Sequence, residues 1–354
     1  MKALVLAGGA GTRLRPFSYS MPKQLIPIAN KPVLEHVLEN IRDVGVTDVG
    51  VIVGDWAQEI SEAIGDGSRF GLRITLIPQE KPLGLAHCVA IAQPFLGDDD
   101  FVMYLGDNML PGGVADIAAD FTARRPEAHI VVHKVSDPRA FGVAELAPDG
   151  AVRRLVEKPQ QPQSDLALIG VYFFTAAIHR AVAAIEPGAR GELEITDAVQ
   201  WLVTHEARVT ASEYDGYWRD TGRAEEVLDC NRQLLGSLSA RADGEVDGAS
   251  ELTGRVVVEA GARVVRSRID GPAVIGAGTL VEDSAIGPGT SIGRGCALRR
   301  TTLLDSIVMD GASITAVTGL RGSLIGRNAV VDTGAEGEGH RLVVGDHTRV
   351  EVAA

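Results

Sequence analysis

Residues 1–18 read MKALVLAGGAGTRLRPFS, a short apolar run followed at once by a glycine-rich loop. The run 2–7 predicts a buried β-strand, because it is too short for the apolar core of a signal peptide. Glycines directly after a buried strand let backbone N–H groups approach a phosphate chain, and Arg13 adds a cation beside them. Leu14 replaces the last glycine of the dinucleotide-binding pattern, and no Walker A Lys-Ser/Thr follows. The loop alone therefore indicates either phosphate binding or a tight structural turn.

Short apolar runs alternate with amphipathic segments through the first half of the chain. The segments are KALVLA (2–7), PVLEHVLENIRDVG (32–45), VGVIVG (49–54), a helical stretch at 56–64, RITLIPQ (73–79), AHCVAIAQPFL (86–96) and DFVMYLGDN (100–108). This β-α-β-α-β-α-β order predicts an α/β domain with a mixed, mainly parallel sheet and helices on both faces. Ligands of such sheets bind beyond the carboxyl ends of the strands. Both the glycine loop and the turn Gly106-Asp107-Asn108 follow a strand directly and are expected there.

The second half of the chain changes character after a helical segment at 223–238. Residues 129–218 add further strands to the first domain, and a Gly-, Ala- and Asp-rich stretch follows the helix near 240–250. At 354 residues two domains are expected. We therefore predict a catalytic domain at 1–238, a linker at 239–250 and a second domain at 251–354.

From Val257 onward apolar residues recur about every six positions, often before glycine. The series runs through Ile269, Ile275, Val281, Ile286, Ile292 and Leu298, with Ile325-Gly326 later. We interpret the step of five between Val281 and Ile286 as a single phase slip at a turn. A hexapeptide period predicts a parallel β-helix of stacked coils, whereas a β-sandwich would alternate at period two.

The composition describes a folded chain without a nucleic-acid-binding surface. Hydrophobic residues make up 45% and charged residues 23%, and no apolar run approaches the length of a membrane span. The net charge of −13 argues against nucleic acid as a partner. Cys88, Cys230 and Cys296 lie far apart and outside any CxxC spacing, so a reducing cytoplasm is the expected location.

Six motifs follow one another along the first 235 residues. They are GGAGTRL (8–14), PKQLIPI (22–28), LGDN (105–108), EKP (157–159), RGELEITD (190–197) and WRDTG (218–222). In this order and spacing they resemble the sugar-nucleotide pyrophosphorylases, specifically the glucose-1-phosphate thymidylyltransferases. The hexapeptide tail resembles the long-form members of that family. The resemblance implies a Rossmann-like nucleotidyltransferase domain followed by a left-handed β-helix, and transfer of a thymidylyl group from dTTP to glucose 1-phosphate with release of pyrophosphate.

The chemistry of this transfer explains why no catalytic triad is needed. A sugar phosphate is largely ionised near neutral pH, since its second pKa is about 6, so it attacks the α-phosphorus without a general base. Catalysis then consists of positioning and of neutralising anionic oxygens with Mg²⁺, Lys and Arg. By resemblance, Asp107 and Asp220 hold the Mg²⁺, a hard cation that takes oxygen ligands. The resemblance completes the catalytic set with Arg13, Lys23 and Lys158.

The resemblance also implies two sets of binding residues. Nucleotide binding falls to Leu6, Gly8, Gly9, Gly11, Thr12, Arg13, Gln24, Gln79, Gly84 and Asp107. Sugar-phosphate binding falls to Asn108, Gly142, Glu157, Lys158, Val171, Tyr172, Arg190 and Glu192. Gln79 and Gly84 match the residues that meet thymine, which differs from uracil by one methyl group worth about 1 kcal/mol. Taken singly, the cations fit solvated charges and Tyr172 fits core packing.

Other functions remain open from the sequence. A uridylyltransferase or another sugar-1-phosphate nucleotidyltransferase would differ in base preference or sugar pocket. Acyl transfer by the β-helix would need a histidine base, but 251–331 contains none and only His340 and His347 follow. A non-catalytic sensor should have lost residues such as Asp107 or Asp220, which are present. Flat coil faces and exposed ends favour a homo-oligomer assembled partly through the β-helix.

Overall fold

The computed structural model describes residues 1–333 and 341–352, so His340 lies outside the described residues. The chain forms two compact units. One contains Met1–Ala10 and Leu34–Asp220, and the other contains Gly11–Val33 and Thr221–Ala354. Among the described residues, no helix has the length and apolar character needed to cross a membrane.

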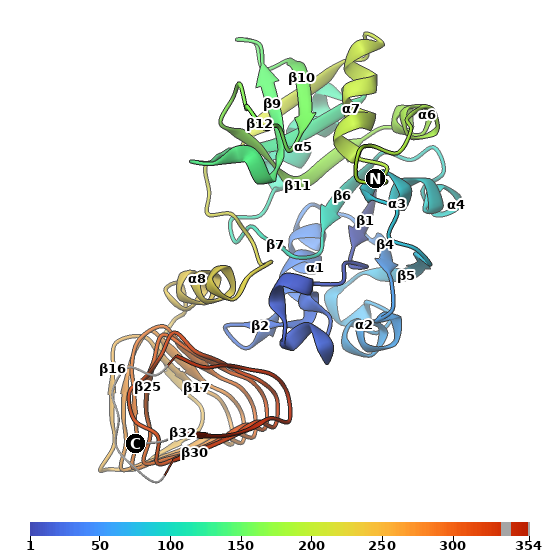
Figure 1. The fold of residues 1–354 in the computed structure, drawn as a ribbon. Coiled ribbons are helices and arrows are strands. Elements are labelled where there is room, and N and C mark those ends of the chain that lie inside the picture. The colour runs from blue at the N-terminus through green and yellow to red at the C-terminus, as the bar shows by residue number, and fades with distance from the viewer. Residues whose placement is uncertain (334–340, 353–354) are drawn as a thin grey trace. The chain divides into compact units, whose positions relative to one another are not determined.

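A nine-stranded mixed sheet forms the centre of the first unit (Figure 1). Its main path runs β10-β9-β11-β6-β1-β4-β5, and β8 pairs with β11 and β12. The strands are β1 (Lys2–Leu6), β4 (Asp48–Val53), β5 (Arg73–Pro78), β6 (Phe101–Leu105), β8 (Ala128–Lys134), β9 (Gly142–Leu146), β10 (Val152–Glu157), β11 (Leu166–Phe174) and β12 (Val209–Glu213). Strands β6, β1, β4 and β5 are parallel, which confirms the predicted order, whereas β11 is antiparallel to β6, β8 and β9.

Helices cover both faces of this sheet, which is why its central strands are apolar on both sides. On one face α3, α6 and α7 pack with Leu4 and Phe101 in one buried cluster. On the other face Phe121 of α5 packs against Phe173 of β11, with ring centroids 5.4 Å apart. The helices are α1 (Val33–Asp43), α2 (Ala57–Ile64), α3 (Leu85–Ile91), α4 (Gln93–Leu96), α5 (Ala115–Arg124), α6 (Ala177–Ala184) and α7 (Ile195–Thr204).

The second unit contains α8 (Ala224–Leu235) and a parallel β-helix with three faces. The first face is β14 (Arg241–Ala242), β17 (Val256–Val258), β20 (Ala273–Ile275), β23 (Thr290–Ile292), β26 (Ile307–Val308), β29 (Leu324–Ile325) and β31 (Val343–Val344). The second is β15 (Glu245–Val246), β18 (Arg263–Val265), β21 (Leu280–Glu282), β24 (Ala297–Arg299), β27 (Ser313–Thr315), β30 (Val330–Thr333) and β32 (Arg349–Val352). The third is β16 (Glu251–Thr253), β19 (Arg268–Asp270), β22 (Ala285–Ile286), β25 (Thr302–Leu304) and β28 (Leu320–Arg321). These stacked parallel strands confirm the parallel β-helix predicted from the hexapeptide period, and they are consistent with the left-handed form that the family resemblance implies.

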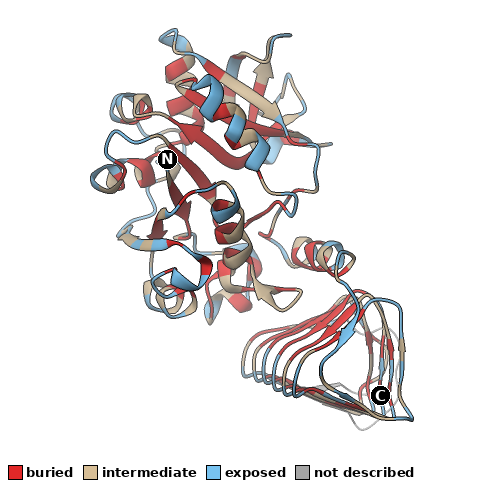
Figure 2. Ribbon diagram, turned by 180° about the vertical axis from the view of Figure 1, so that it is seen from behind, coloured by how far each residue is buried: buried red, intermediate tan, exposed pale blue. Residues whose placement is uncertain are grey.

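Successive coils of the β-helix bury apolar residues from all three faces, such as Ile275, Val281 and Ile286, and Figure 2 shows the buried residues following the strands of the coils. The step of five between Val281 and Ile286 is not a single slip, because it also separates Val264 from Ile269 and Leu298 from Leu303. Each of these shorter sides turns at a residue of positive φ, such as Asp283 at 49°. The prediction of one irregularity was therefore wrong: a tight corner between the second and third faces recurs in three successive coils.

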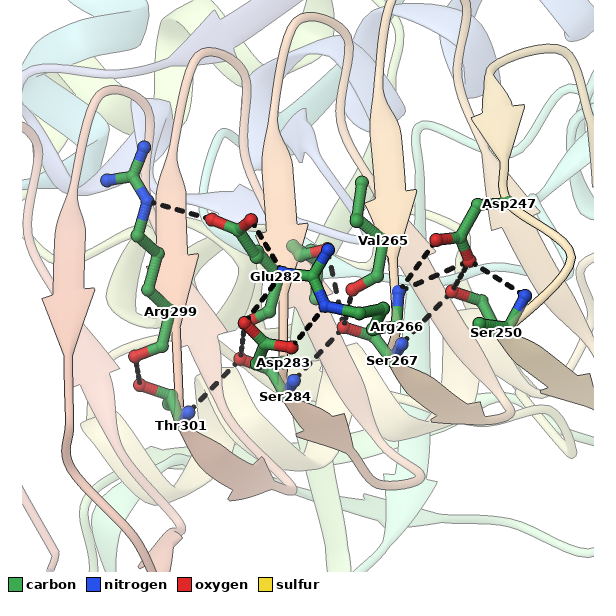
Figure 3. Close-up of polar contacts among 12 residues, drawn as sticks. Asp247, Ser250, Val265, Arg266, Ser267, Glu282, Asp283, Ser284, Arg299 and Thr301 are labelled. Carbon is green, nitrogen blue, oxygen red and sulfur yellow. Dashed lines mark hydrogen bonds and ion pairs between the residues drawn. The ribbon is translucent and has the colours of Figure 1, made fainter.

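A ladder of hydroxyl groups stabilises this corner (Figure 3). The backbone N–H of Ser267, Ser284 and Thr301 each donates to the hydroxyl 17 residues earlier, at 3.0 to 3.1 Å. Outside the ladder Arg266 pairs with Asp283 at 2.7 Å. A shallow groove of about 520 Å³ runs along the same corner, but its charged side chains already pair with one another, so we assign it no ligand.

The predicted linker contains strands of the β-helix. Both β14 and β15 lie within 239–250 and pair with β17 and β18. Gly and Asp are common both at the corners of such coils and in flexible linkers, so the composition of 239–250 fits either kind of structure. The division into 1–238, 239–250 and 251–354 stays a prediction.

Candidate active site

The glycine loop begins where β1 ends, at the edge of the sheet that the predicted site requires. Ala7 N donates to Ile52 O at 2.9 Å, which continues the β1–β4 pairing into the loop. A Cβ placed on Gly8 would lie 3.3 Å from Gln79 Oε1 and 3.4 Å from Gly54 N. Gln79 directly follows β5, so the parallel strands bring two of the predicted nucleotide residues, Gly8 and Gln79, together.

Gly84 and Gln79 are also neighbours. Gln79 Nε2 lies 3.5 Å from Gly84 O, 3.0 Å from His87 Nδ1 and 3.2 Å from Cys88 Sγ. Burial raises the pKa of the Cys88 thiol to about 12, so that side chain stays a neutral thiol. The turn therefore holds the Gln79 amide next to Gly84, and base binding by these two residues stays a prediction.

A substitution of Gly84 is expected to be costly for a reason other than base binding. Its φ is 107°, and a Cβ there would lie 2.4 Å from Leu193 O. We expect Gly84→Ala to lower the free energy of unfolding by about 3 kcal/mol or more, measured by chemical denaturation. Gly45→Ala is the matched control, because Gly45 has φ 87° but nothing within 4 Å, and about 1 kcal/mol is expected there. Equal costs at the two positions would contradict the close packing of Gly84.

Two short strands place the predicted metal ligands Asp107 and Asp220 at neighbouring positions. β7 (Asn108–Met109) and β13 (Arg219–Asp220) are antiparallel, with Asp220 directly opposite Asn108 and therefore beside Asp107. Gly106 N donates to Leu6 O at 2.9 Å, which ties this turn to the end of β1. Asp107 is 8% exposed. Residues more than 100 positions apart in the sequence thus meet at one place.

The chemistry of this carboxylate pair fits a divalent cation. No group of three or more His, Cys, Asp or Glu side chains suited to a metal occurs among the residues that the structure describes. Two carboxylates are the donor set that Mg²⁺ takes when water and substrate oxygens complete its octahedron. Asn108, 3% exposed, donates to Asp107 Oδ1 at 3.1 Å and accepts from Trp218 Nε1 at 2.7 Å, so the Asp107 carboxylate is held by an amide that Trp218 in turn holds in place.

A cluster of charged side chains joins the predicted sugar-phosphate residues. Arg190 NH2 lies 3.3 Å from Glu157 and 3.2 Å from Glu192, and Lys158 Nζ lies 2.8 Å from Glu157. A Cβ on Gly142 would lie 3.2 Å from Glu157 Oε2, so this glycine leaves room for the carboxylate. The structure therefore brings together five of the predicted residues: Gly142, Glu157, Lys158, Arg190 and Glu192.

Two residues of this cluster were missed by the sequence analysis. Glu194 is 5% exposed and accepts from Arg190 NH2 at 2.6 Å. Burial raises the pKa of the Glu194 carboxyl, although Arg190 beside it acts in the opposite direction. Thr196, 2% exposed, donates to Glu157 Oε2 at 2.7 Å. Both belong to the RGELEITD motif, which was the available signal.

Val171 and Tyr172 are buried in β11. Val171 is 0% exposed, and the Tyr172 ring stacks on Phe174 with centroids 5.9 Å apart. Burial also raises the pKa of the Tyr172 hydroxyl. Core packing, which the sequence left open for Tyr172, accounts for these contacts, and sugar binding by the two residues stays a prediction.

The remaining predicted nucleotide residues lie in Gly11–Val33 of the second unit, except Leu6 and Gly9, which lie in the first. Gly11 has φ 61°, and a Cβ on it would lie 3.2 Å from Lys23 Cβ and 3.3 Å from Ser18 Cβ. Gly11 therefore lets Lys23 approach the glycine loop. Gln24 is 1% exposed, whereas Thr12 and Arg13 are exposed.

The chain belongs to the nucleotidyl transferase family, whose family model matches residues 2–237. Among its relatives, the glucose-1-phosphate thymidylyltransferase of Streptomyces griseus is 55% identical, covering 100% of both chains. The glucose-1-phosphate thymidylyltransferase of Streptomyces antibioticus is 54% identical, covering 99% of both. A crystal structure of a glucose-1-phosphate thymidylyltransferase from Bacillus anthracis in complex with sucrose superposes with a TM-score of 0.62 at 31% identity, over 66% of this chain and 94% of that one.

Proposed function

We propose that this enzyme transfers a thymidylyl group from dTTP to glucose 1-phosphate, giving dTDP-glucose and pyrophosphate. A phosphate oxygen of the sugar forms a bond to the α-phosphorus, and the bond from that phosphorus to the departing pyrophosphate breaks. The observation that carries this proposal is the pairing of Asp220 with the Asp107 turn, close to the end of β1. Two relatives that are named glucose-1-phosphate thymidylyltransferase, and that match this chain over essentially its whole length, support the proposal.

The nucleotide is bound by the glycine loop and by the turn after β5. Gly8, Gly9 and Gly11 allow backbone N–H groups to approach the phosphates, with Leu6 and Thr12 beside them. Arg13, Lys23 and Gln24 bind the triphosphate, and Gln79 pairs with the base where Gly84 allows close approach. The cations neutralise the charge that builds up on the leaving pyrophosphate.

The sugar phosphate is bound by the charged cluster around Glu157. Lys158 and Arg190 hold its phosphate, because a guanidinium and an ammonium group both form strong charge-assisted hydrogen bonds with phosphate oxygens. Glu157 and Glu192 accept hydrogen bonds from hydroxyl groups of the sugar. Around the sugar lie Asn108, Gly142, Val171 and Tyr172. This orientation directs the phosphate oxygen at the α-phosphorus and replaces any need for a general base.

Asp107 and Asp220 would hold one Mg²⁺. A divalent cation held there would supply positive charge that lowers the repulsion between the two anionic substrates. The carboxylates themselves fix where that charge is placed.

We also propose a cytoplasmic homo-oligomer assembled partly through the β-helix. Sedimentation measurements on the full chain would test the oligomeric state.

The decisive experiment follows pyrophosphate release from glucose 1-phosphate with dTTP, UTP, ATP, CTP or GTP in separate reactions containing Mg²⁺. We expect dTTP to give the highest kcat/KM and UTP to follow within about tenfold, since one methyl group is worth about 1 kcal/mol. Release with none of the five nucleotides would reject the proposed function. A preference for UTP would retain the reaction and replace the nucleotide.

A further inference from the structure

The segment Gly11–Val33 contains little regular structure of its own. It consists of the single turns η1 (Thr12–Leu14), η2 (Phe17–Tyr19) and η3 (Lys23–Leu25) and the two-residue strands β2 (Pro27–Ile28) and β3 (Lys31–Pro32). The hydrogen bonds of these turns span only a few residues. A segment of this kind has a high conformational entropy to lose, so contacts from other elements decide how firmly it is held.

An ion pair at one end of the β-helix holds the middle of this segment. Asp346, whose side chain is 1% exposed, accepts from Arg327 NH2 at 2.5 Å and from Ser20 Oγ at 2.8 Å. The same Arg327 NH2 donates to Ser20 O at 2.9 Å. Gly345 also abuts the segment, because a Cβ there would lie 3.2 Å from Pro16 Cβ. Both the hydroxyl and the carbonyl of Ser20 are thus bound by one pair of β-helix residues.

A buried amide holds the far end of the segment. Asn231 of α8 is 0% exposed, and its Oδ1 accepts from Ala29 N and from Ser291 Oγ, both at 2.9 Å. Its Nδ2 donates to Gly289 O at 2.9 Å. Asn30 Nδ2 donates to Ile292 O at 2.7 Å. One side chain on α8 therefore joins the turn between β2 and β3 to the coils of the β-helix.

We propose that the β-helix positions the triphosphate-binding residues, with Asp346, Arg327 and Asn231 acting as positioning residues for Lys23 and Gln24. Ser20 precedes Lys23 by three residues and Ala29 follows it by six, so the two sets of contacts bracket the lysine. If either set of contacts is lost, nucleotide binding must also supply the free energy needed to order the segment, and the affinity for the nucleotide falls. Glucose 1-phosphate binding, which uses the cluster around Glu157, is unaffected. This inference rests on the proposed function of Lys23 and Gln24.

Three variants of the full chain test the inference: Ser20→Ala, Asp346→Asn and Asn231→Ala. We expect each to raise the dissociation constant and the KM of dTTP about tenfold, while the KM of glucose 1-phosphate stays within twofold. Amide hydrogen exchange in 17–30 becomes faster in each variant. Ser20→Ala removes the hydrogen bond to Asp346 by changing a residue of the segment and none of the β-helix, so the β-helix folds as in the wild type.

Asp283→Asn is the matched control, because it breaks an Arg–Asp pair of the β-helix at Arg266 and none of the contacts to Gly11–Val33. We expect wild-type dTTP binding and wild-type exchange in 17–30. Dissociation constants and exchange rates within twofold of wild type in all three test variants would overturn the inference, as would an equal loss in Asp283→Asn. A wild-type chain that releases no pyrophosphate would reject the proposed function instead, and the exchange rates would still report whether the β-helix holds the segment.

Discussion

Replacing Asp107 or Asp220 by asparagine is expected to lower kcat about 10² to 10³-fold. Each substitution keeps the size and shape of the side chain and removes the negative charge that a divalent cation requires. The Asn108 amide can still donate to the carbonyl oxygen of an asparagine at 107, so the turn and the β7–β13 pairing persist. The loss should therefore appear in kcat and in metal affinity and leave the melting temperature almost unchanged.

Mn²⁺ binding, measured by electron paramagnetic resonance, is a second readout of the same prediction. Both variants are expected to bind Mn²⁺ at least tenfold more weakly than the wild type, and removal of metal by EDTA should abolish pyrophosphate release in the wild type. Asp48→Asn is the control, because Asp48 pairs with Arg73 on the surface at the start of β4. Wild-type turnover in either test variant would reject the metal assignment.

Arg190→Ala is expected to raise the KM of glucose 1-phosphate about a hundredfold. Arg190 faces Glu157, Glu192 and Glu194, at 2.6 to 3.3 Å. Without the guanidinium, these carboxylates would repel the phosphate as well as one another. Arg190→Lys keeps the charge but loses the planar fork that binds several oxygens at once, so an intermediate KM is expected.

The KM of dTTP distinguishes a local effect from a general one, and it should change less than threefold in both Arg190 variants. Arg154→Ala provides the matched control, since Arg154 pairs with Glu145 at 3.7 Å across β9 and β10 and contacts none of the cluster. Steady-state kinetics with each substrate varied in turn measure these constants. A KM for glucose 1-phosphate within threefold of wild type in Arg190→Ala would contradict the assigned role.

The β-α-β order and the β-helix were predictable because both leave a local signature. Burial on both faces of a parallel sheet produces continuous apolar runs such as Ala3 to Leu6, and each side of a coil repeats one inward residue. The antiparallel pairing of β11 with β6, β8 and β9 left no such signature, because the partner and direction of a strand are set by contacts far along the chain. The recurring five-residue corner was missed for a related reason, since only one of its copies stood out in the apolar pattern.

The candidate site was predictable as a set of motifs and not as an arrangement. The sequence by itself determined that glycines follow a buried strand, that Asp107 ends another, and that cations and carboxylates recur in EKP and RGELEITD. Only the tertiary structure decided that Asp220 pairs with the Asp107 turn, that Glu194 holds Arg190, and that Ser20 meets Asp346. Periodicity reports the burial of each residue in its own element, whereas these contacts join residues whose partners no local pattern specifies.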